Sequence, residues 1–91
     1  MVTKTEFEAA YADYLAAGVR YQEAGAKFNA AHAEFERLTD LWNKGQLSHQ
    51  AMYDAKKKYS EARREYQNAI IDWEQAHDLY FFIGAEYKRS G

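Results

Sequence analysis

The stretch FEAAYADYLAAGVRYQEAGAKFNAAHAEFERLTDLW, residues 7–42, places an aromatic ring at every seventh position. A large side chain recurs at the same spacing beyond Gly45. The first series is Phe7, Tyr14, Tyr21, Phe28, Phe35 and Trp42, and the second is Met52, Tyr59, Tyr66, Trp73, Tyr80 and Tyr87. A smaller residue follows three positions after almost every member, for example Ala31 after Phe28. This spacing is typical of the a and d positions of a heptad repeat, and it predicts a coiled coil.

Folding the chain back at Gly45 places each large side chain of one series opposite a small residue of the other. Phe28 then lies opposite Ala62, and Ala31 lies opposite Tyr59. Such layers fill a core without voids or overlap. The predicted fold class is therefore all-α, a long antiparallel two-helix hairpin that forms a single domain over residues 1–91. We expect one helix over about 4–43, a turn at 44–47, and a second helix over about 48–87 that frays from Lys88 onward.

We call the line along which the two helices meet the seam. Charged residues beside this seam favour the same register. The expected pairs across the seam are Glu34 with Lys58, Lys27 with Glu65, and Arg20 with Asp72. Each pair is opposite in sign. Exposed pairs contribute only about 0–1 kcal/mol, but together they disfavour a slipped register.

Residues suited to helix ends stand at the expected helix boundaries. Thr3 and Thr5 each precede a Glu by three positions, which is the spacing of a capping box. Gly45 suits the left-handed residue that ends a helix, and Ser48 suits the N-cap of the next. These residues predict where the first helix begins and where the chain turns.

Composition excludes several classes of protein. The 91 residues contain no proline and no cysteine, so long helices are favoured and disulfides are excluded. A net charge of −2 makes nucleic acid an unlikely partner. The longest apolar run, residues 79–85, is too short to cross a bilayer, so no membrane association is expected. Residues 1–8 do not resemble a signal peptide, which predicts a cytoplasmic location.

A lone hairpin buries little apolar surface, so we expect a homodimer that forms a four-helix bundle. The expected interface residues are Gly18, Gly25, Ile70, Ile71, Phe81 and Phe82. The two glycines lie beside the seam, where small residues would allow a second hairpin to approach closely. The outer face of the first helix is rich in alanine and is interrupted by Leu15 and Val19. The four larger residues are apolar residues that the seam does not use, and scattered surface residues are the alternative interpretation of them.

Motifs that carry chemistry are weak in this sequence. Glu74 and His77 have the Glu-x-x-His spacing of di-iron bundles, and His32 with Glu36 could supply two zinc ligands. Neither pair is completed by further ligands, so no metal and no cofactor is expected. No catalytic residue is identified, since no nucleophile has a neighbouring base, and we expect no enzymatic activity.

A basic patch near the turn is the candidate site for an anion or a charged partner. It consists of Lys56, Lys57, Lys58, Arg63 and Arg64. Lysine and arginine side chains of this kind bind phosphates of nucleic acids. A nucleic-acid-binding accessory protein is therefore one alternative function.

The turn Trp42-Asn43-Lys44-Gly45, between two helices in a chain of this length, resembles the small secreted WXG-type helical hairpins. That family has one residue between its Trp and Gly, whereas here there are two. The family's C-terminal Tyr-x-x-x-Asp/Glu signal is absent from residues 80–91. The resemblance thus covers the layout alone and stays an alternative. The leading hypothesis is a non-enzymatic protein-protein interaction module, a small adaptor or an inhibitor that binds and occludes a larger protein.

Overall fold

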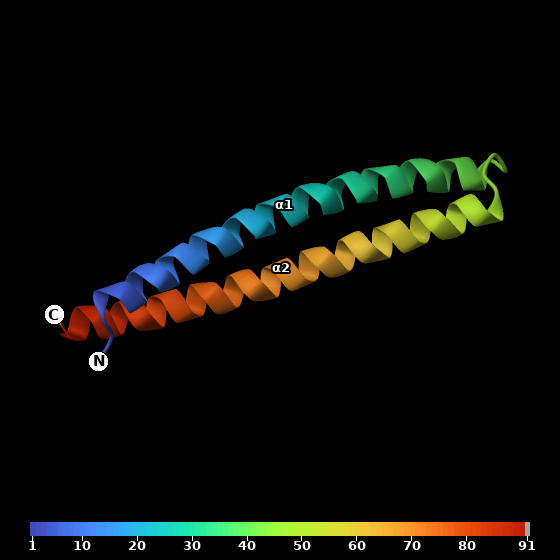
Figure 1. The fold of residues 1–91 in the computed structure, drawn as a ribbon. Coiled ribbons are helices and arrows are strands. Elements are labelled where there is room, and N and C mark those ends of the chain that lie inside the picture. Colours follow the sequence, from blue (N-terminus) through green and yellow to red (C-terminus); the bar gives the residue numbers. More distant parts are fainter. Residues whose placement is uncertain (91) are drawn as a thin grey trace. The chain divides into compact units, whose positions relative to one another are not determined.

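Two long helices make up the computed structural model, which describes residues 1–90. Helix α1 spans Lys4–Asn43 and helix α2 spans His49–Ser90, and a short connection joins them (Figure 1). The two helices pack against each other, and no strand occurs in the part of the chain that is described. The predicted all-α antiparallel hairpin is confirmed. Neither helix has, within those residues, an apolar segment long enough to cross a lipid bilayer.

The second helix is longer than the sequence predicted. We expected fraying from Lys88, but α2 continues through Ser90, so that expectation is wrong for residues 88–90. Lys88 and Arg89 occupy the last turn, where positive charge interacts favourably with the helix dipole. Arg89 also pairs with Glu86 one turn earlier at 3.2 Å. Gly91 lies outside the described residues.

The hairpin divides into two compact units. Unit 1 combines Met1–Gln22 of the first arm with Asn68–Gly91 of the second, and unit 2 consists of Glu23–Gln67, including the turn. Their buried residues are few and mostly small. Ala10, Ala17 and Ala69 are buried in unit 1, and Met52 and Ala55 are buried in unit 2.

The aromatic rings interleave in each unit. In unit 2, Phe28 contacts the rings of Tyr66 and Tyr59 at centroid distances of 5.2 and 5.6 Å. These two tyrosines flank Ala62, the residue predicted to lie opposite Phe28, so the geometry agrees with the predicted register. In unit 1, Tyr14 lies in the same way between Tyr80 at 5.2 Å and Trp73 at 6.3 Å.

Rings of one helix also stack on rings of the other. The sequence pattern predicted only that each ring lies opposite a small residue. Side chains on an α-helix lean toward its N-terminus. In antiparallel helices a ring on α1 and a ring slightly farther along α2 therefore lean toward each other. The stacked pairs follow this rule: Phe7 with Tyr87, Tyr14 with Tyr80, Tyr21 with Trp73, Phe28 with Tyr66, and Phe35 with Tyr59. Each such pair contributes about 0.5–1.5 kcal/mol beyond its buried area.

None of the three predicted ion pairs across the seam forms within residues 1–90, where pairs such as Lys4 with Glu8 and Asp40 with Lys44 join residues of one helix. Glu34 pairs with Arg37, one turn further along α1, with Nη2 of Arg37 2.6 Å from Oε1 of Glu34. A neighbour on the same helix loses less side-chain entropy in pairing than a residue on the other helix does. Arg37 is therefore the ion-pair partner of Glu34, while the charge of Lys58 acts on the same carboxylate from across the seam.

Hydrogen bonds at the helix ends match the sequence signals. The Thr3 hydroxyl accepts a bond from the Glu6 backbone N–H at 3.1 Å, which selects Thr3 rather than Thr5 as the N-cap. Gly45 has a φ of +71°, and the N–H groups of Gly45 and Gln46 donate to carbonyl oxygens of the last turn of α1. This bonding is a Schellman motif, which requires a left-handed residue such as glycine. Ser48 then caps α2 by accepting from the Ala51 N–H at 3.1 Å.

Candidate protein-interaction site

Exposed apolar side chains concentrate in unit 1. Beyond Met1, its large exposed apolar residues are Tyr11, Leu15, Val19, Ile71, Leu79, Phe81 and Phe82. The corresponding residue in unit 2 is Tyr53. The surface of unit 1 is therefore the candidate interaction site of this chain.

Four of these exposed residues and the half-buried Ile70 share one side of the seam, which we call the Tyr11 flank: Tyr11, Leu15 and Val19 of α1, and Ile70 and Phe81 of α2. The three α1 residues follow one another at four-residue spacing and so form a row on one helix face. Ile70 and Phe81 are eleven residues apart, about three helical turns, and share a face of α2. Ring contacts join the two rows, because Tyr80 lies 5.3 Å from Tyr11 and 5.4 Å from Phe81.

A hollow lies on this flank near the start of α1. Its volume is about 260 Å³, and it is lined by Phe7, Tyr80, Phe81, Gly84, Ala85 and Lys88. Gly84 has no side chain to fill the space, and a Cβ there would lie only 3.3 Å from Cε2 of Phe7. The lining is mostly apolar, with the Lys88 ammonium as its one charge. The hollow therefore suits an aliphatic or aromatic side chain of a binding partner.

The predicted interface residues occupy different surroundings. Ile71, Phe81 and Phe82 are exposed, and Ile70 is half-buried. Phe81 and Phe82 are consecutive, so they point about 100° apart and belong to different stripes of α2. The Tyr11 flank includes Phe81 and not Phe82.

The two predicted interface glycines lie against rings of their own chain. A Cβ on Gly18 would lie 3.7 Å from Nε1 of Trp73, and one on Gly25 would lie 3.4 Å from Cε1 of Tyr66. These rings give each glycine a neighbour within the hairpin. Their role in an interface stays a prediction.

Sequence reasoning missed Tyr11, Leu15 and Val19 as interface candidates. They were overlooked because the outer face of α1 was considered apart from α2. In an antiparallel pair, however, the e positions of both helices border the same side of the seam. Tyr11 is at such a position, as are Ile70 and His77 of α2. Combining the heptad positions of both helices would have placed Tyr11 beside Ile70, whereas Leu15, Val19 and Phe81 lie at outer positions of the repeat.

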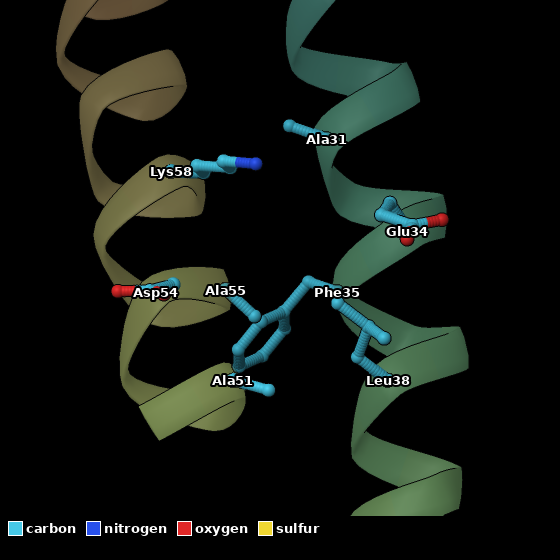
Figure 2. A pocket seen from close by; sticks show the side chains of 8 residues that line it. All are labelled: Ala31, Glu34, Phe35, Leu38, Ala51, Asp54, Ala55 and Lys58. Carbon is cyan, nitrogen blue, oxygen red and sulfur yellow. The ribbon is translucent and has the colours of Figure 1, made fainter. Parts of the chain in front are cut away.

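Unit 2 has a second hollow, on the side of its seam where Glu34 and Lys58 lie. It measures about 350 Å³ and has an apolar floor of alanines, Phe35 and Leu38, with charged groups at the rim. Figure 2 shows the Phe35 ring crossing from α1 toward Ala55 of α2, and the Lys58 side chain reaching toward α1. The hydrogen bonds from Arg37 lower the pKa of the Glu34 carboxyl, and the positive charge of Lys58 lowers it further.

The basic residues near the turn do not converge on one surface. All five are exposed, and none forms an ion pair with another described residue. Lys56, Lys57 and Lys58 are consecutive, so each points about 100° from the next. Lys56 shares a face with Arg63, and Lys57 shares another with Arg64. Binding of an anion or nucleic acid here stays a prediction.

Of the candidate metal ligands, His32 contacts Glu36 as predicted, whereas the contact of His77 is with Asp78 and not with Glu74. Nδ1 of His32 lies 3.5 Å from Oε1 of Glu36, and Nδ1 of His77 lies 3.4 Å from Oδ1 of Asp78. Throughout residues 1–90, no three His, Cys, Asp or Glu side chains come together in a way that could hold a metal ion. The His77 ring instead packs against Phe81 at 4.5 Å, so it belongs to the aromatic surface of the Tyr11 flank.

Comparison with known proteins gives no relative for this chain: no family model, no curated protein and no solved structure matches it.

Proposed function

We propose that this chain is a non-enzymatic protein-protein interaction module that binds other proteins through the Tyr11 flank of unit 1. The observation that carries the proposal is the exposure of Tyr11, Leu15, Val19 and Phe81, whose accessible fractions range from 44 to 58%. Water-exposed clusters of this kind are uncommon on monomeric proteins and mark interaction sites. Tyrosine and phenylalanine are also enriched at the centres of protein interfaces.

The apolar character of the flank supports binding more than catalysis. A catalytic site brings polar groups together in a space that excludes water. The hollow beside Gly84 has an apolar lining and a single ammonium group. A partner side chain would gain free energy there by leaving water, without any chemical step. Such a module could serve as an adaptor, or as an inhibitor that covers a surface of a larger protein. The cytoplasmic location stays a prediction.

The proposal is tested by affinity purification of the tagged chain from its source cells, followed by mass spectrometry. The test variant combines Leu15→Ser and Phe81→Ser, which removes two large apolar groups from the flank. The matched control is Tyr53→Ser, which removes a ring that is 64% exposed in unit 2. Circular dichroism first establishes that both variants retain the helical content of the wild-type chain.

We expect at least one protein to be enriched by the wild-type chain and by the Tyr53→Ser control, and lost with the double variant. The proposal is wrong if all three chains enrich the same proteins equally, since the flank then contributes nothing to recognition. Adding the purified partner to the chain and measuring the partner's own activity then separates an inhibitor from an adaptor.

A further inference from the structure

We infer that a second copy of this chain covers the Tyr11 flank, in a two-fold symmetric pair in which Leu15 of each copy enters the hollow beside Gly84 of the other. The inference rests on the proposed function, because it names a partner for the same surface. Three features of the chain favour a second copy: its exposed area, the spacing of Leu15 from the hollow, and two unpaired charges.

The exposed area leaves room for an interface of ordinary size. The chain exposes 6822 Å². A compact protein of the same mass, 10.6 kDa, exposes about 5,500 Å². The difference, roughly 1,300 Å², exceeds the ~800 Å² that each partner buries in a standard interface. Among the residues whose burial the structure describes, only four alanines and Met52 are buried, and association with a second copy would supply the apolar burial that such a small chain lacks.

Leu15 and the hollow are spaced so that a two-fold axis can bring each onto the other in a pair of copies. The hollow lies at the level of Phe7, because the Phe7 ring is the nearest neighbour of a Cβ on Gly84. Leu15 is eight residues further along α1, about 12 Å away along the axis of the helix. In an isologous pair, a projecting side chain and the hollow that accepts it belong to the same surface. An axis through Tyr11, midway between the two levels, inserts each Leu15 into the other copy's hollow.

The same two-fold rotation brings opposite charges of the two copies near each other. Glu74 and Lys88 are both exposed, and neither forms an ion pair with another residue of the described chain. In the register that places Phe28 opposite Ala62, Leu79 lies opposite Tyr11 and so marks the level of the axis on α2. Rotation about the axis brings Glu74 of one copy to within four residues of Lys88 of the other, or about 6 Å along the helix. Each copy thus offers an acidic and a basic group that the other can pair.

Sedimentation equilibrium on the 91-residue chain over a range of micromolar concentrations tests the inference. We expect a mass of twice 10.6 kDa for the wild-type chain. Leu15→Ser should weaken the dimer roughly 100-fold, because symmetry removes two buried leucines at once. Tyr53→Ser, the control in unit 2, should leave the dissociation constant unchanged.

A charge exchange tests the geometry without removing apolar area. Glu74→Lys alone and Lys88→Glu alone should each weaken the dimer roughly 10-fold, because both symmetric pairs become repulsive. The doubly exchanged chain should regain an affinity within about threefold of wild type, since its pairs are attractive again. Both residues are exposed, so these variants are expected to fold even if Leu15→Ser does not.

Three results overturn the inference: a wild-type chain that stays monomeric, a mass above that of a dimer, or a doubly exchanged chain that is no tighter than the single variants. A monomeric wild-type chain whose cellular partner is still lost with Leu15→Ser and Phe81→Ser would leave the proposed function standing. In that case a different protein covers the flank. Equal enrichment of the same proteins by the wild-type chain, the Tyr53→Ser control and the double flank variant would remove the proposed function itself.

Discussion

Replacing Gly18 and Gly84 by alanine should have different effects, although both lie inside helices of unit 1. A Cβ added at Gly18 would lie 3.7 and 3.8 Å from atoms of Trp73, which is ordinary van der Waals contact. A Cβ added at Gly84 would lie 3.3 Å from Cε2 of Phe7, which is too close without movement. The substitution by alanine is therefore free of strain at Gly18, whereas at Gly84 it requires the Phe7 ring to move.

The expected magnitudes follow from helix propensity and from these distances. Alanine is more favourable than glycine in a helix interior by about 1 kcal/mol. Gly18→Ala should retain this gain, which corresponds to about 4–8 °C in Tm for a chain of this size. At Gly84 the ring of Phe7 would have to move, and it is held by stacking on Tyr87 at 5.0 Å. The gain and the strain should nearly cancel there.

Thermal melts followed by circular dichroism measure both effects. They are best made at one protein concentration in the Leu15→Ser background, because self-association would add its own stabilisation. Gly25→Ala, with a Cβ 3.4 Å from Tyr66, should fall between the other two. A Tm that falls with Gly18→Ala, or rises more with Gly84→Ala than with Gly18→Ala, would refute the packing described for unit 1.

Two other predictions concern unit 2. Phe28→Ala should lower the free energy of unfolding by about 2–4 kcal/mol, because it removes a half-buried ring that contacts two others. Replacing the exposed Tyr53 by Ala should change it by less than about 0.5 kcal/mol. Urea titration measures both, and equal midpoints would contradict the interleaving of rings described for unit 2. Arg37→Gln should raise the pKa of Glu34 toward its ordinary value, as followed by carbon NMR of the carboxyl group. Since the folded-state pKa is the lower one, the contribution of Glu34 to stability is present at neutral pH and is lost as the pH falls through the folded-state pKa. The Arg37→Gln variant should lose less stability over that acidic range than the wild-type chain.

Much of the fold could be predicted because two strong local signals agree. The seven-residue spacing specifies which face of each helix is buried, and Gly45 with Ser48 specifies where the chain turns. Together they determine the register, so Phe28 could be assigned to the level of Ala62. The stacking of Phe28 on Tyr66 was not predicted, because spacing gives the level of a ring and not the direction in which it leans.

The ion pairs and the interaction surface were harder to predict, because both depend on how residues of the two helices combine. Glu34 has oppositely charged neighbours both along its own helix and across the seam, and the sequence does not rank them. The Tyr11 flank combines residues of both helices, so no single amphipathic pattern reveals it. Leu15 and Val19 resemble isolated surface residues until α2 places Phe81 and Ile70 beside the same seam.

The two tryptophans of the chain fall in different units, Trp42 in unit 2 and Trp73 in unit 1. Trp73 lies against the ring of Tyr21 at 5.5 Å, and Trp42 lies against His49 at 4.9 Å across the turn. Intrinsic fluorescence therefore supplies one native reporter for each half of the hairpin. With excitation selective for tryptophan, Trp42→Phe leaves a signal that arises from unit 1 and Trp73→Phe leaves one that arises from unit 2, so the melting of each half can be observed without any added dye.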